Sequence, residues 1–386
     1  MFIEKLKKHN PALIHTAVRW HQSGKLLPDT YVIDLDMVIQ NATFMIEEAK
    51  KRKIELFFMT KQIGRNPLIA QKLMELGFAG AVCVDVREAL VMKEAGVKIA
   101  HVGHLVQVPT HLIPEIVAAE PSYMTVYTID KAKEISRAAS ELGVKQKILI
   151  RVNRPDDFLY PSQYGGFYEA EWEETVKAIL DLPHIELVGL TSFPCFLYQE
   201  EQKKIVPTHN VSTIKYAQTF IEEKFGIRLM ELNLPSATCT GTLADIARYG
   251  GTQAEPGHSL TGTTPMHAKE DLVEKPAYLY LSEIAHTLGE ESFAYGGGYY
   301  RRSGVSRALV GDVKHLQEVA VLKQDLESID YHFTLGASFK VSQSVIMAFR
   351  TQMFVTRSEV AVVSGIQTEK PVMEGIYDSQ GHFLRR

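Results

Sequence analysis

A lysine stands at the end of an apolar run in FFMTKQIGRNP, residues 57–67. A glycine, an asparagine and a proline follow it closely, and on base rates alone Lys61 would begin an exposed loop. A lysine held among apolar walls, however, loses the hydration of its charged form. This loss lowers its pKa and leaves an amine that can attack a carbonyl. Lys61 is therefore a candidate for Schiff-base chemistry.

Two later segments could hold an anion, namely LPSATCTGT (234–242) and EPGHSLTGT (255–263). Both are rich in Gly, Ser and Thr, which offer hydroxyl groups and backbone N–H groups that a ligand can approach closely. A carbonyl-attacking amine combined with a phosphate cradle indicates a cofactor with both an aldehyde and a phosphate. Pyridoxal 5′-phosphate has both groups, and we expect it to be the cofactor.

The elements that must position these residues alternate between strand and helix. Segments with helical spacing, such as DKAKEISRAASELG, often end in a capping glycine. They separate eight short apolar runs, at 55–60, 80–85, 99–105, 123–128, 147–153, 186–192, 231–236 and 254–259. This pattern predicts an α/β fold, a parallel (β/α)8 barrel whose chemistry lies where strands end. A doubly wound open sheet is the alternative, and the last run, AEPGHS, is the weakest strand.

We expect three regions along the chain. Residues 1–29 form an N-terminal segment that could pack on the second domain, and residues 30–265 form the barrel. Residues 266–386 form a β-rich C-terminal domain, because strand-like runs with few helical stretches fill them. In IDLDMVIQN a short strand leads into a helix that Asp36 could cap. A long insertion, residues 154–172, follows the fifth run and could cover a substrate.

Composition narrows the function classes. Hydrophobic residues make up 45% and charged residues 23% of the 386 residues, as in ordinary globular proteins. The net charge of −4, without a basic cluster, argues against nucleic-acid or membrane-surface partners and favours small molecules. No run approaches the length of a membrane span, and the three cysteines lack metal-ligand spacing. We expect a cytoplasmic protein with no metal site and no membrane partner.

At these residues the sequence resembles the fold-type III pyridoxal-phosphate enzymes, which include alanine and ornithine racemases and the diaminopimelate and ornithine decarboxylases. The resemblance covers most of the chain. It gives Lys61 the role of the lysine that binds the cofactor aldehyde, and Arg151 in LIRVN that of an arginine near the cofactor's phenolic oxygen. Ser236, Thr238 and Gly257 match phosphate-binding positions.

Two segments of the second domain extend the resemblance. FAYGGGYYR (293–301) is similar to the racemases' GYADGYPR, whose first tyrosine reaches the cofactor of the opposite subunit. That role maps onto Tyr295 and implies a homodimer with shared active sites. RTQM (350–353) resembles RVSMD, which makes Met353 a candidate to hold the substrate carboxylate. Arg350 is a further candidate for contact with an acidic group of the substrate.

Departures from the family pattern bear on the reaction. Glu255 should face the pyridine nitrogen, where alanine racemases have arginine and the decarboxylases have EPGR. A carboxylate there keeps the nitrogen protonated and strengthens the cofactor as an electron sink. His258 replaces the arginine of EPGR, so that contact with the phosphate is in doubt. VGLTSFPCFLY lacks the racemases' ring-stacking histidine, and Ser192 or Phe193 could occupy that surface.

The main expectation is an amino-acid racemase that interconverts L- and D-enantiomers, with Lys61 and Tyr295 as its two acid–base groups. Decarboxylation of an amino acid is the alternative, although the decarboxylases' cysteine signature has no match after Cys239. A lyase or dehydratase acting on a β-hydroxy amino acid, and a non-catalytic protein of pyridoxal-phosphate homeostasis, are weaker alternatives. The identity of the amino-acid substrate stays open.

Overall fold

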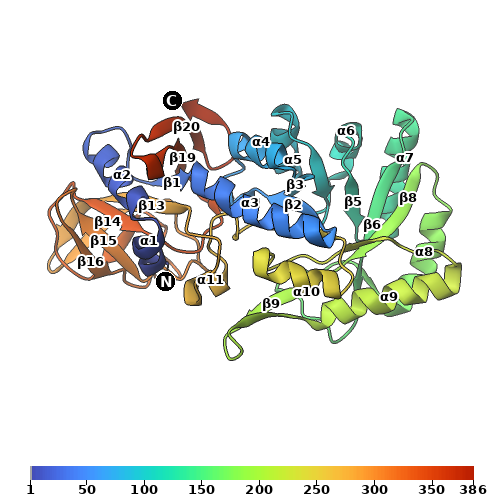
Figure 1. Cartoon of the computed structure of the whole chain (residues 1–386). Helices are drawn as coiled ribbons and strands as arrows, with labels where there is room; N and C mark the ends of the chain where they lie inside the picture. Colours follow the sequence, from blue (N-terminus) through green and yellow to red (C-terminus); the bar gives the residue numbers. More distant parts are fainter. Residues whose placement is uncertain (1) are drawn as a thin grey trace. The chain divides into compact units, whose positions relative to one another are not determined.

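The computed structural model describes residues 2–386 (Figure 1). The chain divides into two compact units that interleave along the sequence. The barrel unit comprises Thr43–Thr60 and Ala70–Gly257, and the strand-rich unit comprises Met1–Ala42, Lys61–Ile69 and His258–Arg386. This division differs from the expected consecutive regions because the first strand and the segment after Lys61 both belong to the strand-rich unit.

The barrel unit contains a closed parallel barrel, as predicted. Its strands are β2 (Glu55–Met59), β3 (Gly80–Cys83), β4 (Ile99–Val102), β5 (Tyr123–Val126), β6 (Gln146–Asn153), β8 (Ile185–Thr191), β11 (Glu231–Asn233) and β12 (Gln253–Ala254). They follow the order β5-β4-β3-β2-β12-β11-β8-β6, and pairing of β5 with β6 closes the ring. The open-sheet alternative is therefore wrong. The eighth strand has two residues, and it is held by pairing with both β11 and β2.

Helices connect successive barrel strands, and Figure 1 shows several of them along the outside of the barrel. They are α4 (Pro67–Leu76), α5 (Val86–Glu94), α6 (Ile113–Ala118), α7 (Ile129–Leu142), α8 (Trp172–Leu180), α9 (His209–Phe225) and α10 (Leu243–Arg248). Helix α7 illustrates the local signals. The Thr128 side chain accepts a hydrogen bond from Lys131 N, and Gly143 ends the helix at φ 68°. These caps fix where the helix begins and ends.

The strand-rich unit is built on one large sheet. Its main path follows the order β16-β15-β18-β13-β1-β19-β20-β21, and β14 pairs with β13 and with β17 beside this path. The strands are β1 (Thr30–Asp34), β13 (Tyr278–Leu288), β14 (Glu291–Tyr295), β15 (Arg307–Gly311), β16 (Leu316–Ala320), β17 (His332–Leu335), β18 (Ser344–Met347), β19 (Glu359–Ser364), β20 (Val372–Asp378) and β21 (Phe383–Arg385). Strand β1 pairs with β13 and β19, so the N-terminal strand completes a sheet formed by the end of the chain.

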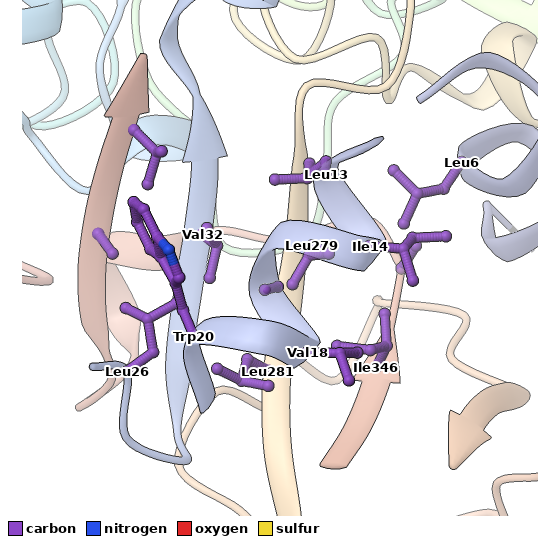
Figure 2. Close-up of a cluster of buried hydrophobic side chains, with 14 of the residues drawn as sticks. Leu6, Leu13, Ile14, Val18, Trp20, Leu26, Val32, Leu279, Leu281 and Ile346 are labelled. Carbon is purple, nitrogen blue, oxygen red and sulfur yellow. The ribbon is translucent and has the colours of Figure 1, made fainter. Parts of the chain in front are cut away.

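A hydrophobic cluster covers one face of this sheet (Figure 2). Helices α1 (Ile3–His9) and α2 (Pro11–Gln22) supply most of its N-terminal members, and Asn10 between them caps α2 by accepting a hydrogen bond from Leu13 N at 3.3 Å. Trp20 packs among residues of the sheet such as Val32 and Leu281. Burial of large apolar side chains at about 1.5–3 kcal/mol each holds the N-terminal segment on the sheet.

The helix after β1 begins slightly earlier than the sequence suggested. Helix α3 (Leu35–Arg52) is capped by Asp34, whose Oδ1 accepts a hydrogen bond from Met37 N at 3.1 Å. Asp36 lies in the first turn and accepts from Gly365 N at 2.6 Å. The expected cap at Asp36 is therefore wrong, because β1 ends at Asp34 and the helix follows without a spacer. Among residues 2–386, no helix has both the length and the hydropathy that crossing a membrane requires.

Candidate active site

Lys61 stands where the sequence placed it, two residues beyond the end of β2. It begins the short 3-10 helix η1 (Lys61–Ile63) and is partly buried. The preceding residue, Thr60, is fully buried in the barrel unit and donates a hydrogen bond to Glu88. Glu88 also accepts from Val84 N at 2.7 Å. The backbone that leads into Lys61 is therefore fixed, while the chemical role of the lysine stays a prediction.

In the strand-rich unit, the segment that begins with Lys61 packs against η5 (Met353–Val355), which contains the predicted substrate-binding Met353. Met353 is fully buried, and its carbonyl accepts a hydrogen bond from Thr356 Oγ1 at 2.7 Å. The structure thus brings two predicted site segments, more than 280 positions apart in the sequence, into contact.

His258 and Arg350 form a second pair in the same unit. Arg350 Nε donates to His258 Nε2 at 3.1 Å. Burial lowers the pKa of His258 well below its ordinary value, and the positive charges of Arg350 and Lys61 lower it further. His258 is therefore neutral and can accept this hydrogen bond. His258, which replaces the arginine of the decarboxylases' EPGR, thus binds a different arginine, Arg350.

Glu255, directly after β12, is the centre of a buried polar network in the barrel unit. Its Oε1 accepts from His101 Nδ1 at 2.9 Å and from Asn233 Nδ2 at 3.0 Å, and its Oε2 lies 3.8 Å from His104 Nε2. Burial alone would raise the pKa of Glu255, but the charge of His104 and the hydrogen bonds from His101 and Asn233 lower it to about 2. The carboxylate is therefore charged and acts only as an acceptor.

Arg151 lies near the carboxyl end of β6 and is almost fully buried. One terminal nitrogen donates to Tyr127 Oη at 3.0 Å, and the other donates to the carbonyl of Gln163 at 3.0 Å and of Phe193 at 3.3 Å. Its Nε is buried and has no hydrogen-bond partner among residues 2–386. The two terminal nitrogens of this guanidinium are thus held in place, and its Nε can still donate a hydrogen bond to an acceptor atom of a ligand.

The residues predicted to contact the phosphate or the ring of the cofactor follow the ends of β8, β11 and β12. Ser236 has a left-handed φ of 86°, and its hydroxyl donates to the carbonyl of Phe196. Thr238 Oγ1 is buried and has no hydrogen-bond partner in the described part of the chain. Ser192 Oγ accepts from Asn210 Nδ2 at 3.0 Å, and Gly257 is buried after Pro256.

These observations test whether the residues fit pyridoxal phosphate. A buried hydroxyl without a partner costs about 1–3 kcal/mol, which a phosphate oxygen would offset by accepting its hydrogen bond. The Nε of Arg151 offers a donor, and Glu255 offers a charged acceptor. Donors for an anion and an acceptor for a protonated ring nitrogen are what this cofactor needs. The residues therefore fit it.

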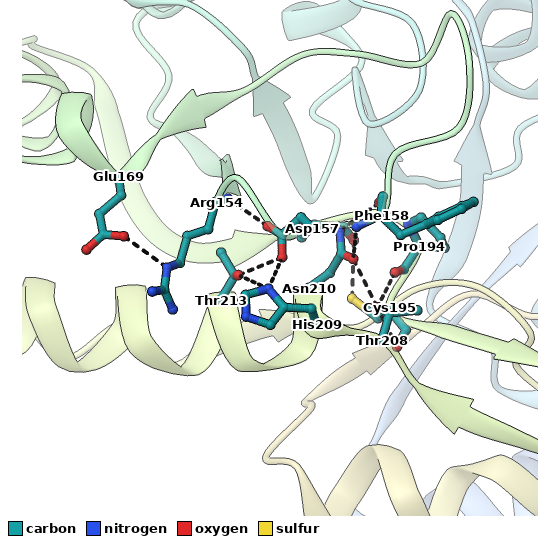
Figure 3. A network of polar contacts seen from close by, with 11 residues as sticks. Arg154, Asp157, Phe158, Glu169, Pro194, Cys195, Thr208, His209, Asn210 and Thr213 are labelled. Atoms are coloured by element: carbon teal, nitrogen blue, oxygen red, sulfur yellow. Dashed lines mark hydrogen bonds and ion pairs between the residues drawn. The ribbon is translucent and has the colours of Figure 1, made fainter.

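The insertion after β6 is fastened to the barrel unit by a polar network (Figure 3). Asp157 accepts from His209 Nδ1 at 2.8 Å and from Thr213 Oγ1 at 2.7 Å, both on α9. Asn210 bonds the backbone of Phe158 in both directions at 3.2 Å and also reaches Ser192. The insertion is thus held in place beside a residue at the end of β8. Its predicted role as a substrate cover stays a prediction.

Tyr295 ends β14 in the strand-rich unit, and its side chain is 40% exposed. Its ring lies 6.2 Å from that of His332. The glycine turn after it is closely packed, since a Cβ on Gly297 would lie 1.9 Å from Asp29 Oδ2 and its φ is 124°. Asp330 Oδ2 accepts from Gly297 N at 3.1 Å and Tyr299 N at 3.0 Å. A fixed turn therefore presents an exposed phenol.

Sequence reasoning did not single out His101 and His104. Both side chains are fully buried, and their rings lie 5.0 Å apart. The signal was a pair of polar residues within the apolar run IAHVGHL, at the end of a strand where barrel chemistry is expected. The predicted Phe193 contacts His104 edge-on, with the two rings 5.7 Å apart.

Comparison with known families identifies two regions. The family described as "Alanine racemase, N-terminal domain" matches residues 33–265, and "YhfX-like, C-terminal domain" matches residues 279–373. The uncharacterized protein YhfX of Escherichia coli is 47% identical over 386 residues, which is the whole of both chains. An alanine racemase of Clostridium perfringens is 26% identical over 280 residues, 71% of this chain and 69% of that one.

Solved structures share the fold at lower sequence identity. A D-threonine aldolase from Filomicrobium marinum superposes with a TM-score of 0.68 at 16% identity, over 92% of this chain and 94% of that one. A diaminopimelate decarboxylase from M. jannaschii gives a TM-score of 0.66 at 14% identity, over 92% and 91%. One fold thus serves an aldolase and a decarboxylase, so the reaction has to be argued from individual residues.

Proposed function

Because the chain belongs to the alanine racemase-like family of fold-type III pyridoxal-phosphate enzymes, we propose that it is an amino-acid racemase with Lys61 and Tyr295 as its two acid–base groups. Pyridoxal 5′-phosphate is the cofactor of this family, and when bound it withdraws electrons from the Cα of an attached amino acid, which acidifies the Cα–H. Inversion then needs one group to remove that proton and another to deliver a proton to the opposite face.

The observation that carries the proposal is the pair of candidate acid–base groups at fixed positions. Lys61 follows a strand end whose last residues are pinned through Thr60 and Glu88. Tyr295 is an exposed phenol at the start of a tightly packed turn. In this proposal Lys61 Nζ and Tyr295 Oη each hold and release the proton at Cα. Glu255 accepts the hydrogen bond of the ring nitrogen, and Arg151, Ser192, Ser236, Thr238, Gly257 and His258 surround the cofactor.

The racemase hypothesis is tested by Tyr295→Phe. Loss of one of two proton-transfer groups should lower racemisation by about 10²–10⁴-fold. One enantiomer should nevertheless still exchange its Cα proton for deuterium in D2O, because Lys61 is intact. Tyr300→Phe, in the same turn, is the matched control. Racemisation of a panel of L- and D-amino acids at the parental rate by Tyr295→Phe would discard the proposal.

The proposal includes a homodimer in which Tyr295 serves the site of the opposite subunit. Lys61→Ala and Tyr295→Phe variants, each nearly inactive, should then complement each other when their subunits are exchanged. About half of the dimers would be mixed, each with one intact site, so about a quarter of the parental activity should return. A mixture of Lys61→Ala with the Lys61→Ala/Tyr295→Phe double variant is the control and should stay inactive. Lack of recovery after verified exchange would contradict shared sites.

Decarboxylation is the second candidate, and the glutamate of EPGH favours it. A charged carboxylate at that position is a feature of the decarboxylase pattern, and a decarboxylase is among the similar structures. Parallel measurement of optical rotation and carbon dioxide release on the same amino-acid panel separates the two reactions. Carbon dioxide release without formation of the other enantiomer would favour decarboxylation. Aldehyde release from β-hydroxy amino acids would instead indicate a lyase.

A further inference from the structure

The network around Glu255 is asymmetric. The two short hydrogen bonds, from His101 Nδ1 at 2.9 Å and Asn233 Nδ2 at 3.0 Å, both converge on Oε1. The other oxygen, Oε2, lies 3.8 Å from His104 Nε2, beyond hydrogen-bond distance. Oε1 is thus bound to the protein, whereas Oε2 is the oxygen left for a ligand. Such an arrangement fixes the plane of the carboxylate.

The two donors are themselves fixed by hydroxyl groups on neighbouring strands. His101 Nε2 lies 2.6 Å from Thr125 Oγ1, on the adjacent strand β5. Asn233 Oδ1 accepts from Thr191 Oγ1 at 2.8 Å, and these two residues are direct partners in the pairing of β11 with β8. Because a charged carboxylate only accepts, Nδ1 of His101 must carry a proton and the Asn233 amide must present Nδ2. Four strands therefore determine the orientation of one carboxylate.

We propose that His101, supported by Thr125, is a positioning residue that holds Glu255 as a charged acceptor with Oε2 directed to the ring nitrogen of the pyridoxal cofactor. This inference rests on the proposed function, in which Glu255 contacts that nitrogen. His101 does not touch the cofactor; it acts by binding Oε1. Without its donor, the buried carboxylate would lose part of the stabilisation of its charge and could rotate about its last bond.

The ring nitrogen itself supplies the test. The full chain, stripped of cofactor, is titrated with pyridoxal phosphate and with its 1-deaza analogue, in which C–H replaces the ring nitrogen. The preference is the ratio of the two dissociation constants, read from cofactor absorbance or protein fluorescence. A charge-assisted hydrogen bond predicts that the parental protein prefers pyridoxal phosphate by about tenfold or more. His101→Phe should reduce this preference to near one, and His101→Gln, which keeps a donor, should retain most of it.

The chain offers a matched control in His21. It is a buried histidine held between a carboxylate and a hydroxyl, with Nε2 3.1 Å from Glu283 Oε2 and Nδ1 2.7 Å from Ser344 Oγ, in the strand-rich unit. His21→Phe should leave the preference unchanged even if it lowers stability. If His101→Phe does not fold, Thr125→Val keeps the histidine but removes its support, and it should lower the preference in the same direction by a smaller factor.

Glu255→Gln separates the possible failures. If Glu255→Gln abolishes the preference while His101→Phe and Thr125→Val keep it at the parental level, the positioning role of His101 is overturned and the role of Glu255 stands. If the parental protein shows no preference, or if Glu255→Gln keeps the parental one, Glu255 does not act on the ring nitrogen. Loss of the preference in both Glu255→Gln and His101→Phe, with His21→Phe unaffected, supports the inference.

Discussion

Two carboxylates, one buried in the barrel unit and one half-buried in the strand-rich unit, receive similar hydrogen bonds and yet have opposite pKa shifts. Glu255 in the barrel unit accepts two side-chain hydrogen bonds, and Asp29 in the strand-rich unit also accepts two, from Tyr280 Oη at 2.8 Å and Ser358 Oγ at 2.5 Å. Burial favours the neutral form of both. Nevertheless the pKa of Glu255 is lowered to about 2, whereas that of Asp29 is raised to about 6.

The difference lies in the charge of the neighbours. Burial has the largest single influence on the pKa of Glu255, but the charge of His104, the hydrogen bond and charge of His101 and the hydrogen bond from Asn233 together outweigh it. Asp29 is bound by neutral hydroxyls, and the lowering effect of Arg357 on its pKa is countered by the negative charge of Asp330. The barrel carboxylate therefore stays charged at neutral pH. Asp29 packs against the glycine turn that follows Tyr295, where its negative charge lowers the stability of the fold.

The comparison is tested most strongly by Glu255→Gln, which keeps the size of the side chain and removes its charge. Because the folded-state pKa lies below the ordinary value, Glu255 contributes stability that is present above pH 4.5 and is lost as the pH falls towards 2. A pKa shift from 4.5 to about 2 corresponds to about 3 kcal/mol of free energy of unfolding. In urea unfolding, the variant should be less stable than the parent at neutral pH, and the two curves should converge in acid. Curves that stay parallel down to about pH 2.5 would contradict the depressed pKa.

Asp29→Asn should show the opposite sign. The folded-state pKa of Asp29 lies above its ordinary value of 3.8, so its contribution is greatest below pH 3.8 and is lost as the pH rises through about 6. Above pH 6, the variant should therefore be more stable than the parent, by about 2 kcal/mol once solvent screening of this partly exposed group is allowed for. Thermal unfolding across this range measures the effect. A variant less stable than the parent at pH 7 would show that the charge of Asp29 stabilises the fold and would contradict its raised pKa.

The sequence predicted the barrel and the position of two candidate site residues at strand ends because both depend on local patterns. Apolar runs alternating with capped helices define the strands, and the position of Lys61 and Glu255 follows from where those runs end. The network of Glu255 could not be predicted in this way, since His101 and Glu255 are 154 positions apart and meet only when the barrel closes. The pairing of β1 with β13 and β19 was missed for the same reason. Long-range pairing leaves no local signal in one sequence.

The smallest expected effect concerns the hydroxyls of Asp29. Burial has the largest influence on the pKa of Asp29 and raises it. The hydrogen bond from Ser358 has the second largest influence and lowers this pKa, and the hydrogen bond from Tyr280 comes next. Ser358→Ala should therefore move the fall in stability to higher pH and cost about 1 kcal/mol above pH 6, where the carboxylate is charged. Tyr280→Phe should move this fall in stability to a smaller extent.

Asp29→Asn is the control background. In it the pH effect of Ser358→Ala should vanish, because no charge is left there for the hydroxyl to stabilise. A pH effect that survives in that background would mean that Ser358 acts on another group; Asp330 is a candidate, because its charge acts on Asp29 and its own pKa is also raised by burial.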